Sequence, residues 1–191
     1  MMYECHYNYK NSSNSLLTMS SSKKTLSLTD QKNNFYFKAV KKETTKVFLD
    51  KINNIFVYME GYLFNKNINY KDMDNGLCES ELIAKLYIKN GIEFIKDLDG
   101  FFCILIFDQN KRRLFAFNDH IGSESIFYHK SSKYISITSD INILRNKYSL
   151  ECLDNERIYS FFEHIHASGN ETFFDDIFQI NAFEYLNFAC M

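Results

Sequence analysis

The amino-acid sequence predicts an α+β fold whose strands form antiparallel sheets. The predicted strands come in blocks separated by helices, a pattern typical of antiparallel sheets rather than of a parallel doubly wound sheet. The 191 residues are 46% hydrophobic and include 19 Phe and 13 Tyr. A chain of this length and composition can bury a sizeable core as one globular domain.

The pattern of the chain changes at Phe35. Residues 11–34 are rich in Ser, Asn and Lys and have only weak apolar periodicity, which indicates a loop or a poorly ordered connection. Short runs of aromatic and β-branched residues follow and favour strands. These predicted strands cover 35–40, 46–49 and 55–59.

A helix is predicted after these strands. Apolar residues recur there at steps of one, three and four residues, so they form one stripe along a helix. The stripe consists of Leu82, Ile83, Leu86 and Tyr87. Gly91 suits the left-handed residue that closes such a helix, and residues 92–98 predict a second, short helix.

The second half of the chain is dense in predicted strands. The run 101–107 is continuously apolar, which is typical of a fully buried strand. Asp154 is a suitable N-cap for a helix that extends to His164. The predicted strands of this half cover 101–107, 113–117, 126–129, 134–138, 177–180 and 183–188.

Charge and hydropathy exclude several classes of partner. The formal net charge is −2, so no electrostatic argument favours nucleic acid or an acidic membrane surface. The longest purely apolar run has seven residues, from Phe101 to Phe107. A bilayer span needs roughly 20 such residues. Residues 1–10 lack the apolar core of a signal peptide, and we therefore expect a soluble, cytoplasmic protein.

The residues that often bind metals or cofactors do not have the required spacing here. The five cysteines contain no CxxC pair, so we interpret them as reduced thiols. The stretch 72–76 starts like a calcium loop, but its Gly and the expected Glu fall out of register. His164 and His166 are two residues apart and would point to different faces of a helix. No glycine-rich phosphate loop is present, so we predict neither a metal nor a cofactor.

Residues 98–128 carry a more specific signal. The segments LDGFFCILIFD (98–108) and RRLFAFNDHIGSESIFY (112–128) resemble consecutive motifs of the N-terminal glutaminase domain of the asparagine synthetase family. Further similar segments follow in the same order, at 137–144, 153–161 and 172–180. The resemblance covers roughly two-thirds of the chain, from Glu60 onwards, and identifies it as a class II glutamine amidotransferase-like chain.

This resemblance implies a more detailed fold. Class II glutamine amidotransferases have the Ntn-hydrolase fold, a four-layer αββα sandwich of two antiparallel sheets. Such a sandwich would bury both faces of the strand over 101–107. We therefore expect a single glutamine amidotransferase-like domain over 1–191, without the ATP-dependent synthetase domain of the family.

The family nucleophile is not in its usual place. In active members a cysteine becomes the first residue once the initiator Met is removed, and its own α-amino group serves as the base. Here the chain begins Met-Met-Tyr-Glu-Cys, so Cys5 could act only after cleavage of residues 1–4. Cys5 and its neighbour His6 would face opposite sides of a strand, so adjacency alone does not pair them.

Three further positions correspond to the family's glutamine pocket. Glu60 aligns with the Asn that supplies an oxyanion donor, a contribution typically worth about 3 kcal/mol. A carboxylate there would instead repel a developing oxyanion. Gly61 keeps the neighbouring backbone N–H, and Glu79 aligns with the acidic residue that holds the α-amino group of glutamine. We call Glu60, Gly61 and Glu79 the pocket positions and interpret them as relics of substrate binding.

The first hypothesis is therefore a catalytically degenerate glutaminase-type domain. It would act as scaffold or partner subunit of a separate ATP-dependent half resembling an asparagine synthetase, a β-lactam synthetase or a lasso-peptide cyclase. No SGGxDS pyrophosphate loop occurs in the 191 residues, so the ATP-binding chain would be a partner, with glutamine as a ligand left open. Two alternatives remain: a glutaminase activated by processing to Cys5, and a truncated or split synthetase-like gene product.

Overall fold

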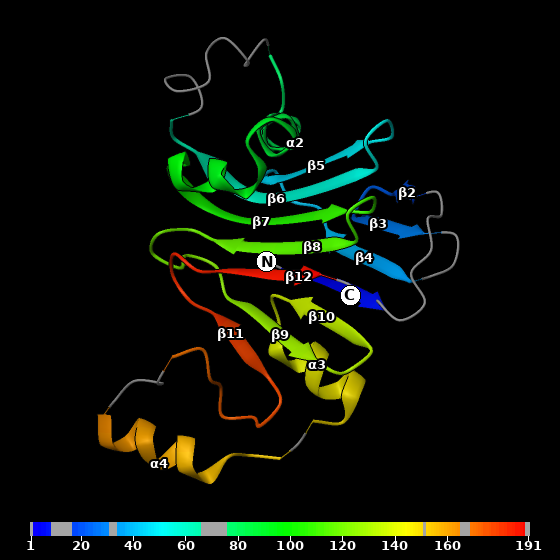
Figure 1. The fold of residues 1–191 in the computed structure, drawn as a ribbon. Coiled ribbons are helices and arrows are strands. Elements are labelled where there is room, and N and C mark those ends of the chain that lie inside the picture. The colour runs from blue at the N-terminus through cyan, green and yellow to red at the C-terminus, as the bar shows by residue number, and fades with distance from the viewer. Residues whose placement is uncertain are drawn as a thin grey trace. The chain divides into compact units, whose positions relative to one another are not determined.

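Two compact units make up the chain in a computed structural model (Figure 1). The first unit contains Met1–Lys41 and Ser125–Asn181, and the second contains Lys42–Glu124 and Ala182–Met191. The structure describes residues 2–8, 17–30, 34–65, 76–150, 152–164 and 169–189. Each unit has its own antiparallel sheet, so the predicted α+β class with antiparallel sheets is confirmed.

The first unit is built on a seven-stranded sheet in the order β11-β9-β10-β1-β4-β3-β2. The strands are β1 (Tyr3–Asn8), β2 (Leu17–Ser21), β3 (Thr25–Asp30), β4 (Phe35–Val40), β9 (Ile126–Lys130), β10 (Tyr134–Thr138) and β11 (Phe178–Ile180). The central strand is β1, which pairs with β10 on one side and β4 on the other. Its side chains alternate between fully and partly buried, as expected when the two faces of a sheet differ.

The prediction of a loop over 11–34 is wrong for the described part of this segment, which forms a hairpin. Residues 17–30 form β2 and β3, and β3 continues the sheet by pairing with β4. Leu26 and Leu28 are buried while the residues between and beside them are only partly buried. The partner strand β2, with two Ser and one Thr among its five residues, is mostly exposed. Leu26 and Leu28 alternate with Thr and Ser over one short strand only, in a segment dominated by Ser, Asn and Lys, which is why composition indicated a loop.

Among its described residues, the first unit has two helices. Helix α3 (Ile141–Tyr148) packs against β9 and β10, and the Asp140 side chain caps it by accepting the N–H of Asn142. The sequence analysis did not predict this helix. Helix α4 (Asn155–His164) begins after Asp154, whose Oδ1 accepts the backbone N–H groups of Glu156 and Arg157 at 2.9 and 3.1 Å. The predicted N-cap of α4 is therefore confirmed.

The second unit is built on a five-stranded sheet in the order β12-β8-β7-β6-β5. Its strands are β5 (Thr45–Asp50), β6 (Ile55–Leu63), β7 (Gly100–Asp108), β8 (Arg113–Asn118) and β12 (Tyr185–Ala189). Helix α2 (Glu79–Asn90) and the short 3-10 helix η1 (Gly91–Asp97) lie over this sheet, α2 against β5 and β6 (Figure 1). Gly91 ends α2 with a positive φ of 65°, as its position predicted, but its ψ of −146° lies outside the left-handed helical region.

Strand β7 is the central strand of the second unit and is buried on both faces. Phe102, Ile104 and Ile106 belong to the apolar core that includes residues of α2 and η1. The alternating residues Cys103, Leu105 and Phe107 are buried as well. This double burial explains why the sequence of β7 is continuously apolar rather than alternating.

The turn after β8 is organised by one buried carboxylate. Asp119 accepts the backbone N–H of Phe102 at 2.9 Å, of Ile121 at 2.9 Å and of Ser123 at 3.1 Å, as well as the Ser123 hydroxyl. Burial alone would raise the pKa of Asp119, but the hydrogen bonds from Ser123, Ile121 and Phe102 outweigh it and hold the pKa below its usual range. Asp119 therefore ties the turn to the start of β7.

Candidate functional site

Cys5 lies in the middle of the central strand of the first unit. It is opposite Ile137 of β10 and Phe37 of β4, and its side chain is fully buried. Burial raises the pKa of the Cys5 thiol, and the nearby Glu4 carboxylate raises it further, against a smaller effect of Lys147. The thiol is therefore held in its protonated form, which is a poor nucleophile.

The residues that precede Cys5 are part of the same sheet. Tyr3 is buried and pairs with Ala39, its backbone N–H donates to Ser139 Oγ at 3.1 Å, and its carbonyl accepts the Thr138 hydroxyl at 2.7 Å. The Glu4 carboxylate forms an ion pair with Lys147. The amino side of Cys5 is thus a peptide bond inside a hydrogen-bonded strand.

The His6 side chain makes its hydrogen bonds with residues other than Cys5. Its Nδ1 lies 2.7 Å from Ser136 Oγ and 3.1 Å from the Tyr148 hydroxyl, which belongs to α3. Burial lowers the pKa of His6 to about 4, and the Lys147 ammonium contributes in the same direction against Glu4. As adjacent strand residues, His6 and Cys5 point to opposite faces of β1, as the sequence predicted.

Glu60 on β6 is a buried carboxylate with hydroxyl partners. It accepts hydrogen bonds from Thr44, from Thr45 at 2.6 Å and from Tyr58 at 3.1 Å. The side chain is only 3% exposed, so these hydroxyls replace the water that a carboxylate otherwise needs. An ionised carboxylate has no hydrogen to donate, so this residue offers no donor to an oxyanion.

Gly61 is required by the close approach of two strands. Its φ is +112°, and a Cβ added there would lie 2.0 Å from the carbonyl oxygen of Phe101 on β7. Its backbone N–H, the one donor that the sequence predicted to survive, donates to the carbonyl of Thr44 at 3.3 Å. The fold therefore requires glycine at position 61 whether or not the site is catalytic.

Glu79 at the start of α2 faces a lysine. Its Oε1 lies 3.7 Å from Lys46 Nζ, and both side chains are mostly buried. The same Nζ donates to the carbonyl oxygen of Gly61 at 2.7 Å and lies 4.9 Å from the centre of the Tyr62 ring. Lys46 thereby connects two of the pocket positions.

The structure brings the three pocket positions together through a segment that the sequence analysis did not identify. Thr44, Thr45 and Lys46 are consecutive, and each contacts at least one of Glu60, Gly61 or Glu79. The only sequence signal was their place at the start of the strand predicted at 46–49, which Lys46 begins. Cys5 belongs to the first unit and the pocket positions to the second.

The remaining motifs of the sequence analysis add no site. Among the described residues, no group of three or more His, Cys, Asp or Glu side chains could hold a metal ion. Asp72, His166 and Cys190 lie outside the described residues. None of the helices that the structure describes has the length and apolar character required to cross a bilayer.

Comparison with known families identifies the chain. The family model of the glutamine amidotransferase domain matches residues 42–190, which is most of the sequence. The chain belongs to this glutamine amidotransferase domain family. The match includes the pocket positions and the Asp119 turn but begins after β1, the strand that carries Cys5.

Curated relatives connect this amidotransferase domain with asparagine synthetases. It is 30% identical over 105 residues to a glutamine-hydrolysing asparagine synthetase of Bacillus subtilis, a match over 51% of this chain and 14% of the relative. It is 28% identical over 96 residues to a putative glutamine-hydrolysing asparagine synthetase of Methanocaldococcus jannaschii, over 49% of this chain and 18% of that relative. The chain thus spans less than a fifth of the length of these relatives.

A solved structure shares the fold of the amidotransferase domain. The glutamine phosphoribosylpyrophosphate amidotransferase of Bacillus subtilis, complexed with ADP and GMP, aligns over 100% of this chain and 49% of its own, with a TM-score of 0.50. The sequence identity is 11%, so this similarity concerns the fold alone. It agrees with the predicted Ntn-hydrolase-type α+β architecture of two antiparallel sheets with helices.

Proposed function

We propose that this chain is a catalytically silent glutamine amidotransferase domain that serves as scaffold or partner subunit of a separate ATP-dependent, amide-forming synthetase half. The observation that carries the proposal is the position of Cys5. It is buried in the middle of β1, with the peptide bonds of Tyr3 and Glu4 ahead of it inside the sheet. Glutaminases of this class need a thiol with a free amine beside it.

Processing to expose Cys5 would remove structure. Cleavage after Glu4 takes away the buried Tyr3 side chain, its bonds to Ser139 and Thr138, and the ion pair of Glu4 with Lys147. Burying one large side chain alone is worth about 1.5–3 kcal/mol. Loss of these contacts opposes the alternative of a processed, active glutaminase.

The oxyanion position gives independent support. A glutaminase stabilises the tetrahedral intermediate with hydrogen-bond donors, whereas Glu60 is an acceptor already bound by three hydroxyls. The Gly61 N–H is directed to Thr44. Neither group is available to stabilise negative charge on a substrate oxygen.

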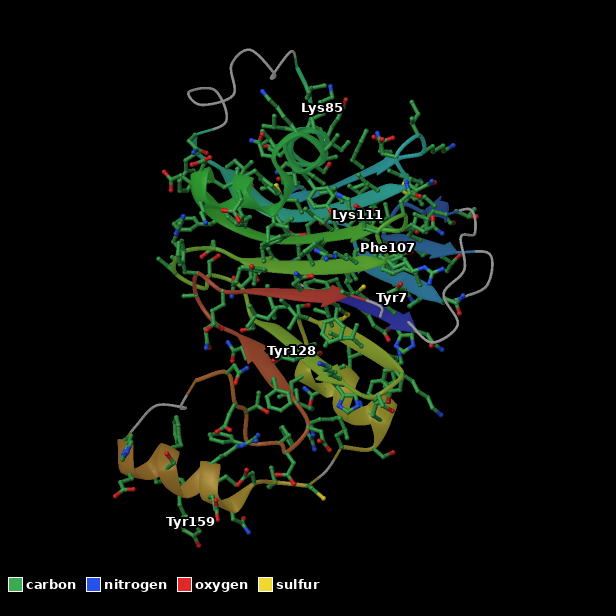
Figure 2. All side chains as sticks on the ribbon, in the orientation of Figure 1. Tyr7, Lys85, Phe107, Lys111, Tyr128 and Tyr159 are labelled. Carbon is green, nitrogen blue, oxygen red and sulfur yellow. The ribbon has the colours of Figure 1, made fainter. Side chains whose placement is uncertain are left out.

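An exposed aromatic surface on α4 supports the partner role. Tyr159 and Phe162 are 74% and 77% exposed, and Tyr159 projects from the outer side of α4 (Figure 2). The opposite side of α4 is held by Phe161 against Phe173 and by Arg157, which donates to the carbonyl of Phe174 at 3.0 Å. Exposed rings on an anchored helix are typical of a docking surface. We assign it to the synthetase half, because the asparagine synthetase relatives are far longer than this chain.

The catalytic part of the proposal is tested by ammonia release from glutamine. The purified chain should release no more ammonia than buffer, and Cys5→Ala should behave identically. Intact mass of the same sample establishes whether residues 1–4 are present. Ammonia release that Cys5→Ala abolishes, together with a mature terminus at Cys5, would favour the processed glutaminase instead.

The partner part is tested by asking whether a neighbouring reading frame encodes an SGGxDS-bearing chain and by co-expressing that chain with this one. We expect the two chains to co-purify, and Phe162→Ser to reduce the yield of the complex by about tenfold, because one exposed ring buried at an interface contributes about 1.4 kcal/mol or more. Ile52→Ser is the matched control, because Ile52 is also exposed but lies in the second unit. Absence of any complex, or equal loss with both variants, would contradict docking through α4.

A further inference from the structure

The ammonium group of Lys46 lies in a site made of three different groups. Its Nζ donates to the carbonyl oxygen of Gly61 at 2.7 Å and faces the Glu79 carboxylate at 3.7 Å. The ring of Tyr62 lies under it, with 4.9 Å from Nζ to the ring centre. A neutral acceptor, a negative charge and an aromatic face are the three kinds of partner that bind a primary ammonium ion.

We propose that Gly61, Tyr62 and Glu79 form a binding site for a primary ammonium ion and that the chain occupies it with its own Lys46. The inference rests on the proposed function, in which the domain no longer turns over glutamine. Lys46 supplies an ammonium group to the Glu79 carboxylate, so the ligand class of the site is a small primary amine or the ammonium end of an amino acid.

The backbone holds Lys46 at this place. Its neighbour Thr45 is fixed by a hydrogen bond to Glu60, and the Thr45 hydroxyl also accepts the backbone N–H of Lys42 at 3.0 Å. Lys46 itself pairs with Met59 in the β5–β6 ladder. A tethered ammonium group therefore competes with free ligands at an effective concentration of about millimolar or higher. Free amines or amino acids at lower concentrations do not displace it.

Removing the tethered group should open the site to a free amine. Lys46→Ala deletes three methylene groups and the ammonium, which together correspond to n-propylammonium. We expect n-propylammonium chloride to raise the thermal midpoint of Lys46→Ala by about 3 °C or more at ten times its dissociation constant. The wild type should shift by less than about a third of this, because its site is occupied.

The matched control is Lys85→Ala. Lys85 lies on α2 (Figure 2) and pairs with Glu81 at 3.3 Å, but its side chain is 47% exposed and has no comparable enclosure. This variant and the double variant Lys46→Ala/Glu79→Gln should show no shift with n-propylammonium. An equal shift of Lys46→Ala with sodium chloride or propan-1-ol, or persistence of the shift in the double variant, would overturn the proposal.

A second measurement uses the wild type and does not depend on the folding of Lys46→Ala. Reductive methylation followed by peptide mass spectrometry should modify Lys46 at least about tenfold more slowly than Lys85, because Lys46 Nζ is held by three partners. Glu79→Gln should increase the rate at Lys46 and leave Lys85 unchanged. Equal rates at the two lysines in the wild type would contradict an occupied site. Ammonia release by the wild type would contradict the proposed function, whereas equal methylation rates in a chain that releases no ammonia would contradict the occupied site alone.

Discussion

The buried carboxylates of Asp119, in the turn, and Glu60, at the pocket, receive their hydrogen bonds from different kinds of donor. At the turn, Asp119 matches the family motif and accepts mostly backbone N–H groups, which any sequence would present there. At the pocket, Glu60 accepts hydrogen bonds from the side-chain hydroxyls of Thr44, Thr45 and Tyr58. The turn thus relies on backbone donors, whereas the pocket relies on donors from side chains. A buried polar group without a ligand must find such partners.

The rate of thiol alkylation tests whether Cys5 is part of the buried framework, and it should show the largest difference. Iodoacetamide under native conditions should modify Cys5 at least about 100-fold more slowly than the exposed Cys78 and Cys152, because burial removes access and raises the thiol pKa. Peptide mass spectrometry over a time course gives the three rates. A rate at Cys5 similar to those of the exposed cysteines would mean that the thiol is accessible and is not part of the buried framework.

The Asp119 turn should contribute most to stability. Asp119→Ala leaves three backbone N–H groups without their acceptor, and we expect a loss of about 3 kcal/mol in the free energy of unfolding. Because the folded-state pKa of Asp119 is lowered, its contribution is present above the unfolded pKa and is lost as the pH falls through the folded value. Urea denaturation measures both effects. The nearby exposed Asp99→Ala should change stability by less than about 0.5 kcal/mol.

The pocket should contribute less than the turn. Glu60→Ala removes the acceptor of three hydroxyls, but hydroxyls can rotate toward other acceptors, so we expect a loss of about 2 kcal/mol. Urea denaturation of this variant is compared with Glu81→Ala on α2, a partly exposed carboxylate with one ion pair. A loss larger than that of Asp119→Ala would mean that the pocket contributes more to stability than the turn.

The smallest effect is the pH dependence caused by His6. Burial lowers its folded pKa to about 4 from an ordinary 6.5, so the unfolded chain takes up the proton first as the pH falls. Stability should therefore decrease between pH 6.5 and 4, by about 1 kcal/mol once the partial exposure of the ring is considered. His6→Gln should lack this decrease, which thermal denaturation at pH 7.0, 5.5 and 4.5 would detect. Parallel curves for both proteins would indicate that His6 does not titrate differently on folding.

Much of the fold could be predicted because it depends on local patterns. Every strand from β4 onwards was placed by runs of apolar and β-branched residues, and α4 by its Asp154 cap. The β2–β3 hairpin was not, because Ser, Asn and Lys dominate the surrounding segment, and Leu26 and Leu28 make only a short alternation. Helix α3 was missed because it has only eight residues, of which Leu144 alone is buried. So short an alternation or stripe gives only a weak period.

Periodicity and motif order are properties of neighbouring residues, and they were enough to predict the antiparallel α+β fold and the amidotransferase family. The roles of Thr44, Thr45 and Lys46 instead depend on contacts between strands. They lie 14 or more positions before Glu60 in the chain and reach the pocket positions because β5 and β6 pair in one register. Which side chains meet across a ladder depends on that register, and a shift by one residue would direct them to the other face.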